Sequence, residues 1–170
     1  MSQSKRICRV IAVTGICATG LWGVLSAHAE LGGAPVSFSN AVSVASIRPS
    51  LTASALLTSG VAAAPAYSVR QTTLNNGTVV REYIAPNGQV FGAAWQGPVQ
   101  PDLGQVLGAA HLATFASGVA AIHAVRGSRA PVSIDQPDLV VHVGGHMRAY
   151  VGQAWLPQAL PAGVSGDDIR

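Results

Sequence analysis

Residues 67–98 alternate between β-branched or aromatic positions and polar positions, and two Asn-Gly steps interrupt this alternation. Asn76-Gly77 and Asn87-Gly88 accept the positive φ of tight turns, so they mark the loops of two consecutive β-hairpins. The pattern therefore predicts a three-stranded antiparallel meander. Its third strand, residues 90–95, is apolar on both faces, which is typical of a central strand that is covered on both sides.

The loop length decides how the first two strands of the meander are paired. With two-residue loops, the carboxylate of Glu82 would share a face with Val80 and Trp95, and burying it there is costly. A three-residue loop, in which a type I turn is closed by a left-handed Gly, places Arg70 opposite Glu82. We prefer this register because it pairs opposite charges across the two strands.

The same loop type in the second hairpin sets the faces of the third strand. It pairs Tyr83 with Phe91 and directs Phe91 and Trp95 to the same face, where both rings fill the core. Gly92 and Ala94 then lie on the other face and leave room there for a closely packed helix.

Two further segments carry a regular pattern. Pro101 and Asp102 suit the start of a helix, and the apolar spacing that follows predicts a helix over about 102–124, broken near Gly108. Residues 138–151 predict a separate C-terminal hairpin that turns at Gly144-Gly145. The expected fold is α+β: a five-stranded antiparallel sheet, made of the three-strand meander plus the C-terminal hairpin, with one broken helix packed on it.

The first 29 residues have the three parts of a secretory signal peptide: the basic residues Lys5, Arg6 and Arg9, an apolar run over 10–25, and Ala27-His28-Ala29. We expect cleavage after Ala29 and a periplasmic or secreted protein. The alternative is a retained membrane anchor. Because Gly and Thr interrupt the apolar run, which falls short of the roughly 20 strongly apolar residues of a span, we expect no membrane span after cleavage.

Removing this segment changes the composition. The whole chain has ten Lys plus Arg against seven Asp plus Glu, and three of the basic residues lie in the signal, so seven of each remain. The rest of the chain is formally neutral, which argues against a nucleic-acid partner because such a partner requires clustered Lys and Arg. Cys8 and Cys17 also lie in the signal, so no disulfide framework is expected after cleavage.

The remaining chain divides by composition. Residues 30–66 are dominated by Ala, Ser, Val and Gly, and we expect a low-complexity leader or linker there, with a docked strand or helix as the alternative. Residues 67–170 are expected to form a single β-rich domain. After the C-terminal hairpin, an extended tail should pack onto the sheet, and Ser165 with Asp168 can cap a final short turn.

Candidate chemistry is sparse. His146, Arg148 and Tyr150 alternate along the last predicted strand and form the best candidate ligand-binding surface, since Arg and Tyr combine polar heads with apolar bodies. The alternative is an ordinary exposed sheet face. His142 and His146 would point to opposite faces of the predicted hairpin, and a zinc site needs three or four ligands, so we expect no metal and no cofactor.

No catalytic residue can be assigned from motifs. The chain contains no Gly-x-Ser-x-Gly elbow, no His-Glu-x-x-His and no phosphate-binding loop. A non-catalytic protein is favoured over an enzyme on this ground.

Five short motifs occur together in the chain: Leu31-Gly-Gly33, Gly77-Thr-Val-Val-Arg-Glu-Tyr83, Ala94-Trp-Gln-Gly97 with Pro101-Asp-Leu103, Gly144-Gly-His-Met-Arg-Ala149, and Leu160-Pro-Ala-Gly-Val164. This combination resembles an uncharacterised family of exported bacterial proteins, domain of unknown function 2844. The resemblance covers most of 67–109 and 135–165. It implies a bacterial envelope or secreted protein of one small domain, and it carries no activity and no functional residue.

The leading hypothesis is an exported non-catalytic module that binds an envelope component or a partner protein. One alternative is a hydrolase-like envelope enzyme that uses His146 with Asp102, Asp135 or Asp138. Another is a structural or assembly protein of the envelope that uses the edge of its sheet.

Overall fold

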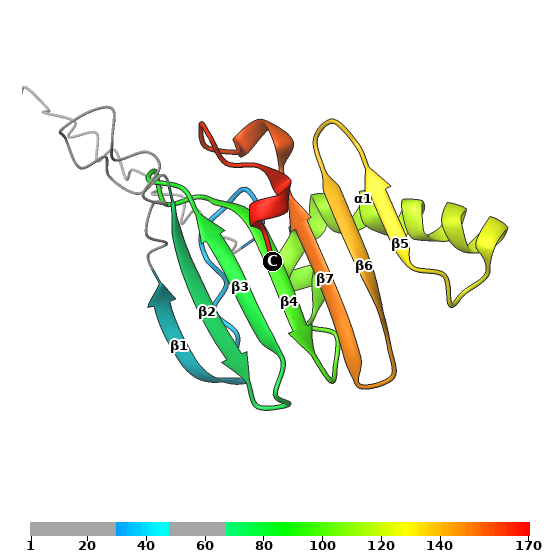
Figure 1. Ribbon diagram of the computed structural model, residues 1–170, viewed down its shortest axis with the longest axis horizontal. Helices are drawn as coiled ribbons and strands as arrows, with labels where there is room; N and C mark the ends of the chain where they lie inside the picture. The colour runs from blue at the N-terminus through cyan, green and yellow to red at the C-terminus, as the bar shows by residue number, and fades with distance from the viewer. Residues whose placement is uncertain (1–29, 48–66) are drawn as a thin grey trace, which may run out of the picture.

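The computed structural model describes residues 30–47 and 67–170, which form a single antiparallel sheet with one long helix (Figure 1). The strand order is β1-β2-β3-β4-β7-β6-β5. The strands are β1 (Ala41–Ile47), β2 (Ser68–Leu74), β3 (Val79–Ile84), β4 (Val90–Gly97), β5 (Val132–Asp135), β6 (Val140–His146) and β7 (Ala149–Trp155), and the helix is α1 (Leu103–Arg126). The signal peptide expected over 1–29 and the leader segment 48–66 lie outside the described residues.

The α+β class agrees with the prediction, but the predicted count of five strands is wrong. The two additional strands, β1 and β5, form the two edges of the sheet. β5 has only four residues, too few for a clear period, and β1 lies in the Ala- and Ser-rich stretch that was expected to be a leader. Residues 30–47 therefore adopt the docked alternative and belong to the sheet and its core.

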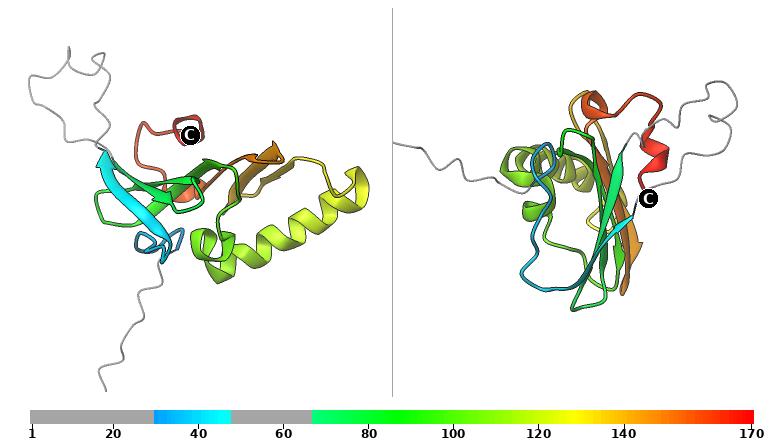
Figure 2. Two further views of the ribbon diagram at one scale, coloured as in Figure 1. Left: turned by 90° about the horizontal axis from the view of Figure 1, so that it is seen from below. Right: turned by 90° about the vertical axis from the view of Figure 1, so that its left-hand side faces the viewer.

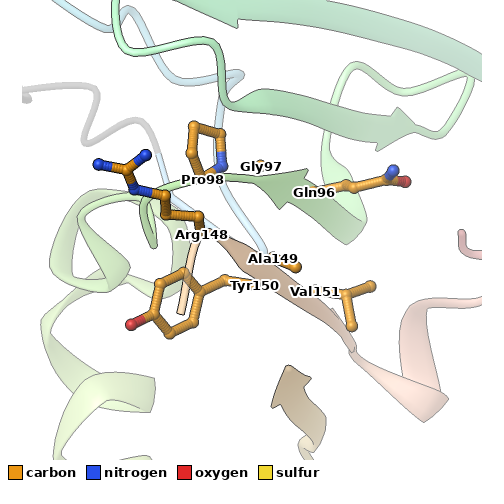
Figure 3. Close-up of a pocket in the computed structure, with 7 residues that line it drawn as sticks. All are labelled: Gln96, Gly97, Pro98, Arg148, Ala149, Tyr150 and Val151. Carbon is orange, nitrogen blue, oxygen red and sulfur yellow. The ribbon is translucent and has the colours of Figure 1, made fainter. Parts of the chain in front are cut away.

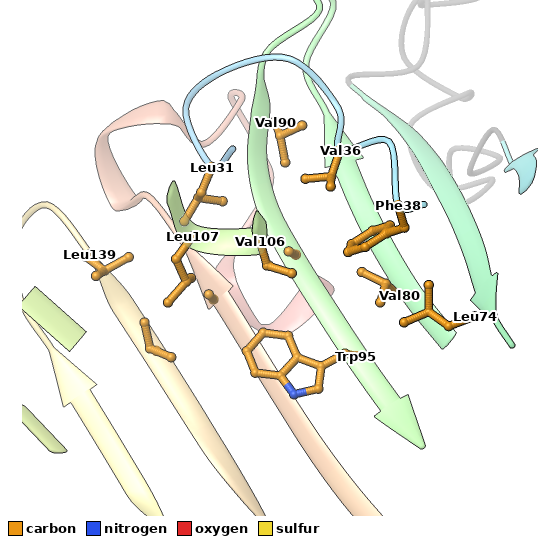
Figure 4. Close-up of a cluster of buried hydrophobic side chains, with 13 residues drawn as sticks. Leu31, Val36, Phe38, Leu74, Val80, Val90, Trp95, Val106, Leu107 and Leu139 are labelled. Carbon is orange, nitrogen blue, oxygen red and sulfur yellow. The ribbon is translucent and has the colours of Figure 1, made fainter. Parts of the chain in front are cut away.

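Both faces of the sheet are covered, which makes three layers (Figure 2). α1 and residues 30–40 lie on one face, and the segment after β7 lies on the other. The core on the helix side is the larger of the two (Figure 4); it contains Leu31, Val36, Phe38, Leu74, Val80, Val90, Ala93, Trp95, Val106, Leu107, Leu139, Val141 and Ala154. The core on the other side contains Val69, Tyr83, Phe91, Ala94 and Ile169. β4 lies between the two cores, which confirms that it is covered on both sides.

The first hairpin has the predicted register, with Arg70 opposite Glu82. The second hairpin has the predicted three-residue loop, in which Gly88 has a φ of 86° and Ile84 pairs with Val90. The register then shifts by one, and Tyr83 pairs with Gly92 instead of Phe91. An extra residue of this kind is a β-bulge, and it changes the face to which the following side chains point.

Because of the bulge, the side chains of β4 point to other faces of the sheet than predicted. Phe91 and Ala94 pack in the core on the tail side, whereas Trp95 packs in the core on the helix side. Gly92 also faces the tail, because a β carbon there would lie 2.6 Å from Cδ1 of Ile169. The two rings are both buried as predicted, but each fills a different core.

The turn of the C-terminal hairpin, formed by β6 and β7, also differs from the prediction. β6 continues through Gly144 and Gly145, and His146 pairs with Ala149, so the loop consists of Met147 and Arg148. Arg148 occupies the left-handed region with a φ of 66°, which is uncommon for a residue other than Gly. The loop therefore lies three residues further along the chain than the Gly-Gly step indicated.

The segment after β7 is fixed to the sheet by its last residues. The Tyr83 hydroxyl donates to the carbonyl of Arg170 over 2.6 Å and accepts from its N–H over 2.9 Å, and Ile169 is completely buried. The predicted cap is confirmed, since the carboxylate of Asp168 accepts from the Ser165 N–H at 2.8 Å.

α1 begins after Asp102, whose carboxylate accepts from the N–H of Gly104 at 2.9 Å, as predicted. The predicted break occurs at Gly108, which has a φ of 78°. By length and composition alone, α1 is apolar enough to cross a membrane, and 17% of that window is buried. Its first turns are part of the core, however, because Val106 and Leu107 are buried against the sheet.

Candidate functional site

Two of the three predicted site residues, Arg148 and Tyr150, line an open depression where β4 ends and β7 begins (Figure 3). We call it the hairpin depression; its lining residues are Gln96, Gly97, Pro98, Arg148, Ala149, Tyr150 and Val151, and its volume is about 430 Å³. The Arg148 and Tyr150 side chains extend together to one side of the strands. His146, the third predicted residue, is exposed on β6 and does not line the depression.

The surroundings of the hairpin depression are apolar and exposed. Met147, at the tip of the loop, is 86% exposed, and Val151 is 52% exposed. Among the described residues, the two ion pairs are Arg70–Glu82 and His142–Asp135, so Arg148 has no carboxylate partner there. A cation, a phenol and large apolar side chains on an open surface are the residue types that protein interfaces favour.

A second polar group lies on the tail side of β5, β6 and β7, where sequence reasoning proposed no site. We call it the polar row; it consists of Ser133, Asp135, His142 and Gln153. Nε2 of His142 lies 2.9 Å from Oδ1 of Asp135, and Ser133 donates to Oδ2 of the same carboxylate at 3.1 Å. Nδ1 of His142 lies 3.4 Å from the Gln153 amide. The rings of His142 and Trp155 form an edge-to-face pair, with centroids 5.3 Å apart and an interplanar angle of 83°.

The polar row does not have the geometry of a Ser-His-Asp triad. In such a triad the His lies between the Ser and the Asp, so that it can accept the proton of the nucleophile. Here Asp135 lies between Ser133 and His142 and accepts from both. The hydrogen bond with His142 is the main reason that the pKa of Asp135 lies below its ordinary value. The row is therefore a set of mutually satisfied groups and does not activate Ser133.

The most deeply buried ionisable group, Glu82, has a structural role. Its Oε1 accepts from the N–H of Val36 at 2.6 Å, and Arg70 donates to the carbonyl of Val36. Nε of Arg70 lies 3.6 Å from Oε2 of Glu82. Burial raises the pKa of Glu82 above 4.5, and this effect outweighs the lowering by the Val36 N–H and by Arg70. Glu82 and Arg70 thus hold the backbone of Val36 on both sides, Glu82 at its N–H and Arg70 at its C=O.

Glu82 is buried, although the register with Arg70 opposite Glu82 was preferred because burying this carboxylate is costly. The register itself is right, but the side chain still lies on the face of Val80, in the larger core. The sequence did not indicate that residues 30–38 cover this face and place the N–H of Val36 beside the carboxylate of Glu82.

Among the described residues, no ion pair joins His146 to Asp102, Asp135 or Asp138, the carboxylates that the enzyme hypothesis named. Asp102 caps α1, and Asp135 bonds to His142 and Ser133. His142 and His146 lie four residues apart on one strand, roughly 13 Å along extended backbone, instead of across a hairpin as predicted. In residues 30–47 and 67–170, no group of three or more His, Cys, Asp or Glu side chains is arranged to hold a metal ion.

The family model described as protein of unknown function, DUF2844, matches residues 27–169. The chain belongs to the DUF2844 family. This confirms the resemblance that the five motifs indicated. The DUF2844 chain matches no curated protein and no solved structure.

The polar row could not be found from sequence because its residues come from three strands, and one of these strands was not predicted. Ser133 and Asp135 alternate over only four residues of β5. The one available signal was this alternation between Val132 and Ile134, two apolar residues that are now buried on the helix side. Arg148 and Tyr150 were predicted to alternate along one strand; Tyr150 lies on β7, whereas Arg148 lies in the loop before it.

Proposed function

We propose that this DUF2844 protein is an exported, non-catalytic module that binds a partner protein of the bacterial envelope through the hairpin depression. The observation that carries the proposal is the grouping of Arg148 and Tyr150 beside Met147 and Val151 on an open surface. Aromatic residues, Met and Arg are enriched where proteins contact each other, and the energetic centre of such contacts is often an Arg or a Tyr.

The shape of the depression supports a macromolecular partner over a small molecule. Small-molecule sites are concave and bury most of the ligand. The hairpin depression instead lies at strand ends and is open, and its lining side chains point to opposite sides of the strands, Arg148 and Tyr150 to one side and Gln96 and Val151 to the other (Figure 3).

The absence of a catalytic arrangement in the described residues supports a binding role. Two groups of the described residues bring ionisable side chains together. In the polar row, Asp135 accepts from Ser133 and His142. In the Arg70–Glu82 ion pair, Nε and Oε2 lie 3.6 Å apart, and Oε1 of Glu82 accepts from the N–H of Val36. Neither presents an activated nucleophile beside a general base.

A photo-crosslinking amino acid at position 147 in the producing bacterium tests the proposal. Position 125 on α1 is a matched control, because Val125 is 85% exposed and Met147 is 86% exposed. We expect a discrete crosslinked partner from position 147 that disappears in Arg148→Ala/Tyr150→Ala and persists in Arg129→Ala. Identical products from both positions would exclude the hairpin depression as the contact surface.

Export is tested separately. We expect the protein in the periplasmic or extracellular fraction, with an intact mass and an N-terminal sequence that begin at Glu30. The tripartite pattern of residues 1–29 supports this expectation. A chain that is recovered uncleaved from the cytoplasm would contradict it.

A further inference from the structure

The two edges of the sheet differ in how they are protected. β5 has four residues and lies between Pro131 and Pro137. α1 packs against it, and Gly118 is close enough that a β carbon would lie 2.5 Å from Ile134. Short edge strands, neighbouring prolines and a covering helix all prevent a sheet edge from pairing with another chain. β5 is therefore a poor template for an additional strand.

Within residues 30–47 and 67–170, β1 has none of these three kinds of protection. Its seven residues pair with β2 on one side, and no strand in the described part of the chain pairs with the other side. Val42, Val44 and Ile47 are 65%, 56% and 47% exposed. β1 contains no charged residue and no Pro. Exposed, uncharged edges of this length are sites at which proteins associate by adding strands.

We propose that β1 pairs antiparallel with β1 of a second copy of this chain, so that two seven-stranded sheets become one continuous sheet. Antiparallel pairing of a strand with its own copy is two-fold symmetric, and each copy contributes the same surface. Val44 is the middle residue of β1, so the two Val44 side chains lie near the axis. Because β1 is uncharged, no like charges face each other across the contact.

A second copy fits this edge better than an unlike strand because the assembly then closes. Each copy offers one open edge and one protected edge, so pairing β1 with β1 uses both open edges and leaves only the two β5 edges outside. A head-to-tail contact of β1 with β5 would instead need the four-residue edge strand between Pro131 and Pro137. The contact is independent of the proposed function, since the hairpin depression lies at β4 and β7, away from β1.

Sedimentation of the purified protein over a range of concentrations tests the proposal. We expect a monomer–dimer equilibrium. Val44→Lys places two ammonium groups beside each other at the axis and should raise the dimer Kd roughly ten-fold or more, because like charges directly opposite each other on adjacent strands are destabilising. Val125→Lys is the control, because it adds the same charge at an exposed site on α1 and should leave the Kd unchanged.

A crosslinking variant makes the test independent of the charge substitution. In a Cys8→Ser/Cys17→Ser background the chain has no other cysteine. Val44→Cys should then form a covalent dimer on mild oxidation, whereas Val125→Cys should not. Amide hydrogen exchange of Ala41–Ile47 should slow as the protein concentration rises.

Three results would each overturn the proposal: a monomer at every concentration, a dimer that tolerates Val44→Lys, or β1 amides that are protected equally at all concentrations. The last result would mean that the edge is covered within one chain. A dimer lost on substituting Arg148 and Tyr150 would instead place the contact at the hairpin depression.

Discussion

The indole of Trp95 on β4 lies directly over Gly152 on β7, and a β carbon at position 152 would come within 2.3 Å of Cζ2 of the ring. β4 and β7 are neighbours in the sheet, and Trp95 pairs with Gly152 in the register. The glycine thus provides the space that allows the largest side chain of the helix-side core to lie flat on the sheet.

We predict that Gly152→Ala destabilises the protein by roughly 1–3 kcal/mol, because the ring or the backbone must shift to accept the methyl group. The measurement is the free energy of unfolding in urea. Gly144→Ala on β6 is the matched control, because the nearest atom to its β carbon would be 4.0 Å away. Equal costs for the two variants would show that strand propensity, and not the ring, determines the effect.

We predict that Trp95→Ala costs roughly 3–5 kcal/mol, which is typical for truncating a buried aromatic side chain. Combined with Gly152→Ala, the cost should be clearly less than the sum of the two single costs, because the methyl group then occupies space that the ring has left. A urea double-mutant cycle measures this coupling. Additive costs would show that the two positions do not compete for the same space.

Glu82 should make stability depend on pH in a definite direction. Because burial raises its pKa above 4.5, the folded state retains a proton that the unfolded state releases, and stability falls as pH rises through the interval between the two values. We predict that Glu82→Gln flattens this fall in the free energy of unfolding above pH 4.5. A slope that is unchanged in the variant would show that Glu82 is ionised in the folded protein throughout this range.

Asp135 provides a control with the opposite sign. Its pKa is lowered from 3.8, chiefly by the hydrogen bond with His142, so its contribution to stability is present above 3.8 and is lost as pH falls through the lowered value. Asp135→Asn should therefore change the acid limb of the stability profile and leave the Glu82 interval intact.

We predict that Tyr83→Phe releases the segment after β7 from the sheet. The variant loses the two hydrogen bonds with the backbone of Arg170, each worth about 0.5–1.5 kcal/mol, while the ring stays in the tail-side core. Limited proteolysis should cut residues 157–170 faster. Tyr67→Phe is the control, since its ring packs on Tyr83 and Phe91 at centroid distances of 5.8 and 5.7 Å; faster cutting in the control as well would contradict the assignment.

The sequence located those elements whose signals are local. Asn76-Gly77 and Asn87-Gly88 fixed both loops of the meander, because the turn geometry depends on the residues in the turn itself. The cap at Asp102 and the break at Gly108 are likewise local. Glu82 opposite Arg70 followed directly from the loop length.

The features that the sequence did not reveal depend on distant contacts. The bulge beside Phe91 places Gly92 under Ile169, a residue that is 77 positions later in the chain. In the C-terminal hairpin, β6 continues through Gly144-Gly145 and the chain turns at Met147 and Arg148. Pairing across the sheet overrides the preference of glycine for turns there. The hairpin depression could be anticipated in part, but the polar row depends on β5, whose four residues give no period.

The hydrogen bonds of Glu82 and Arg70 with the backbone of Val36 hold residues near the start of the described chain on β2 and β3. The Tyr83–Arg170 hydrogen bonds hold its last residue on β3. A protease that removes the segment after β7 would therefore uncover the rings of Phe91 and Tyr83, while the pairing of the described strands needs none of the removed residues.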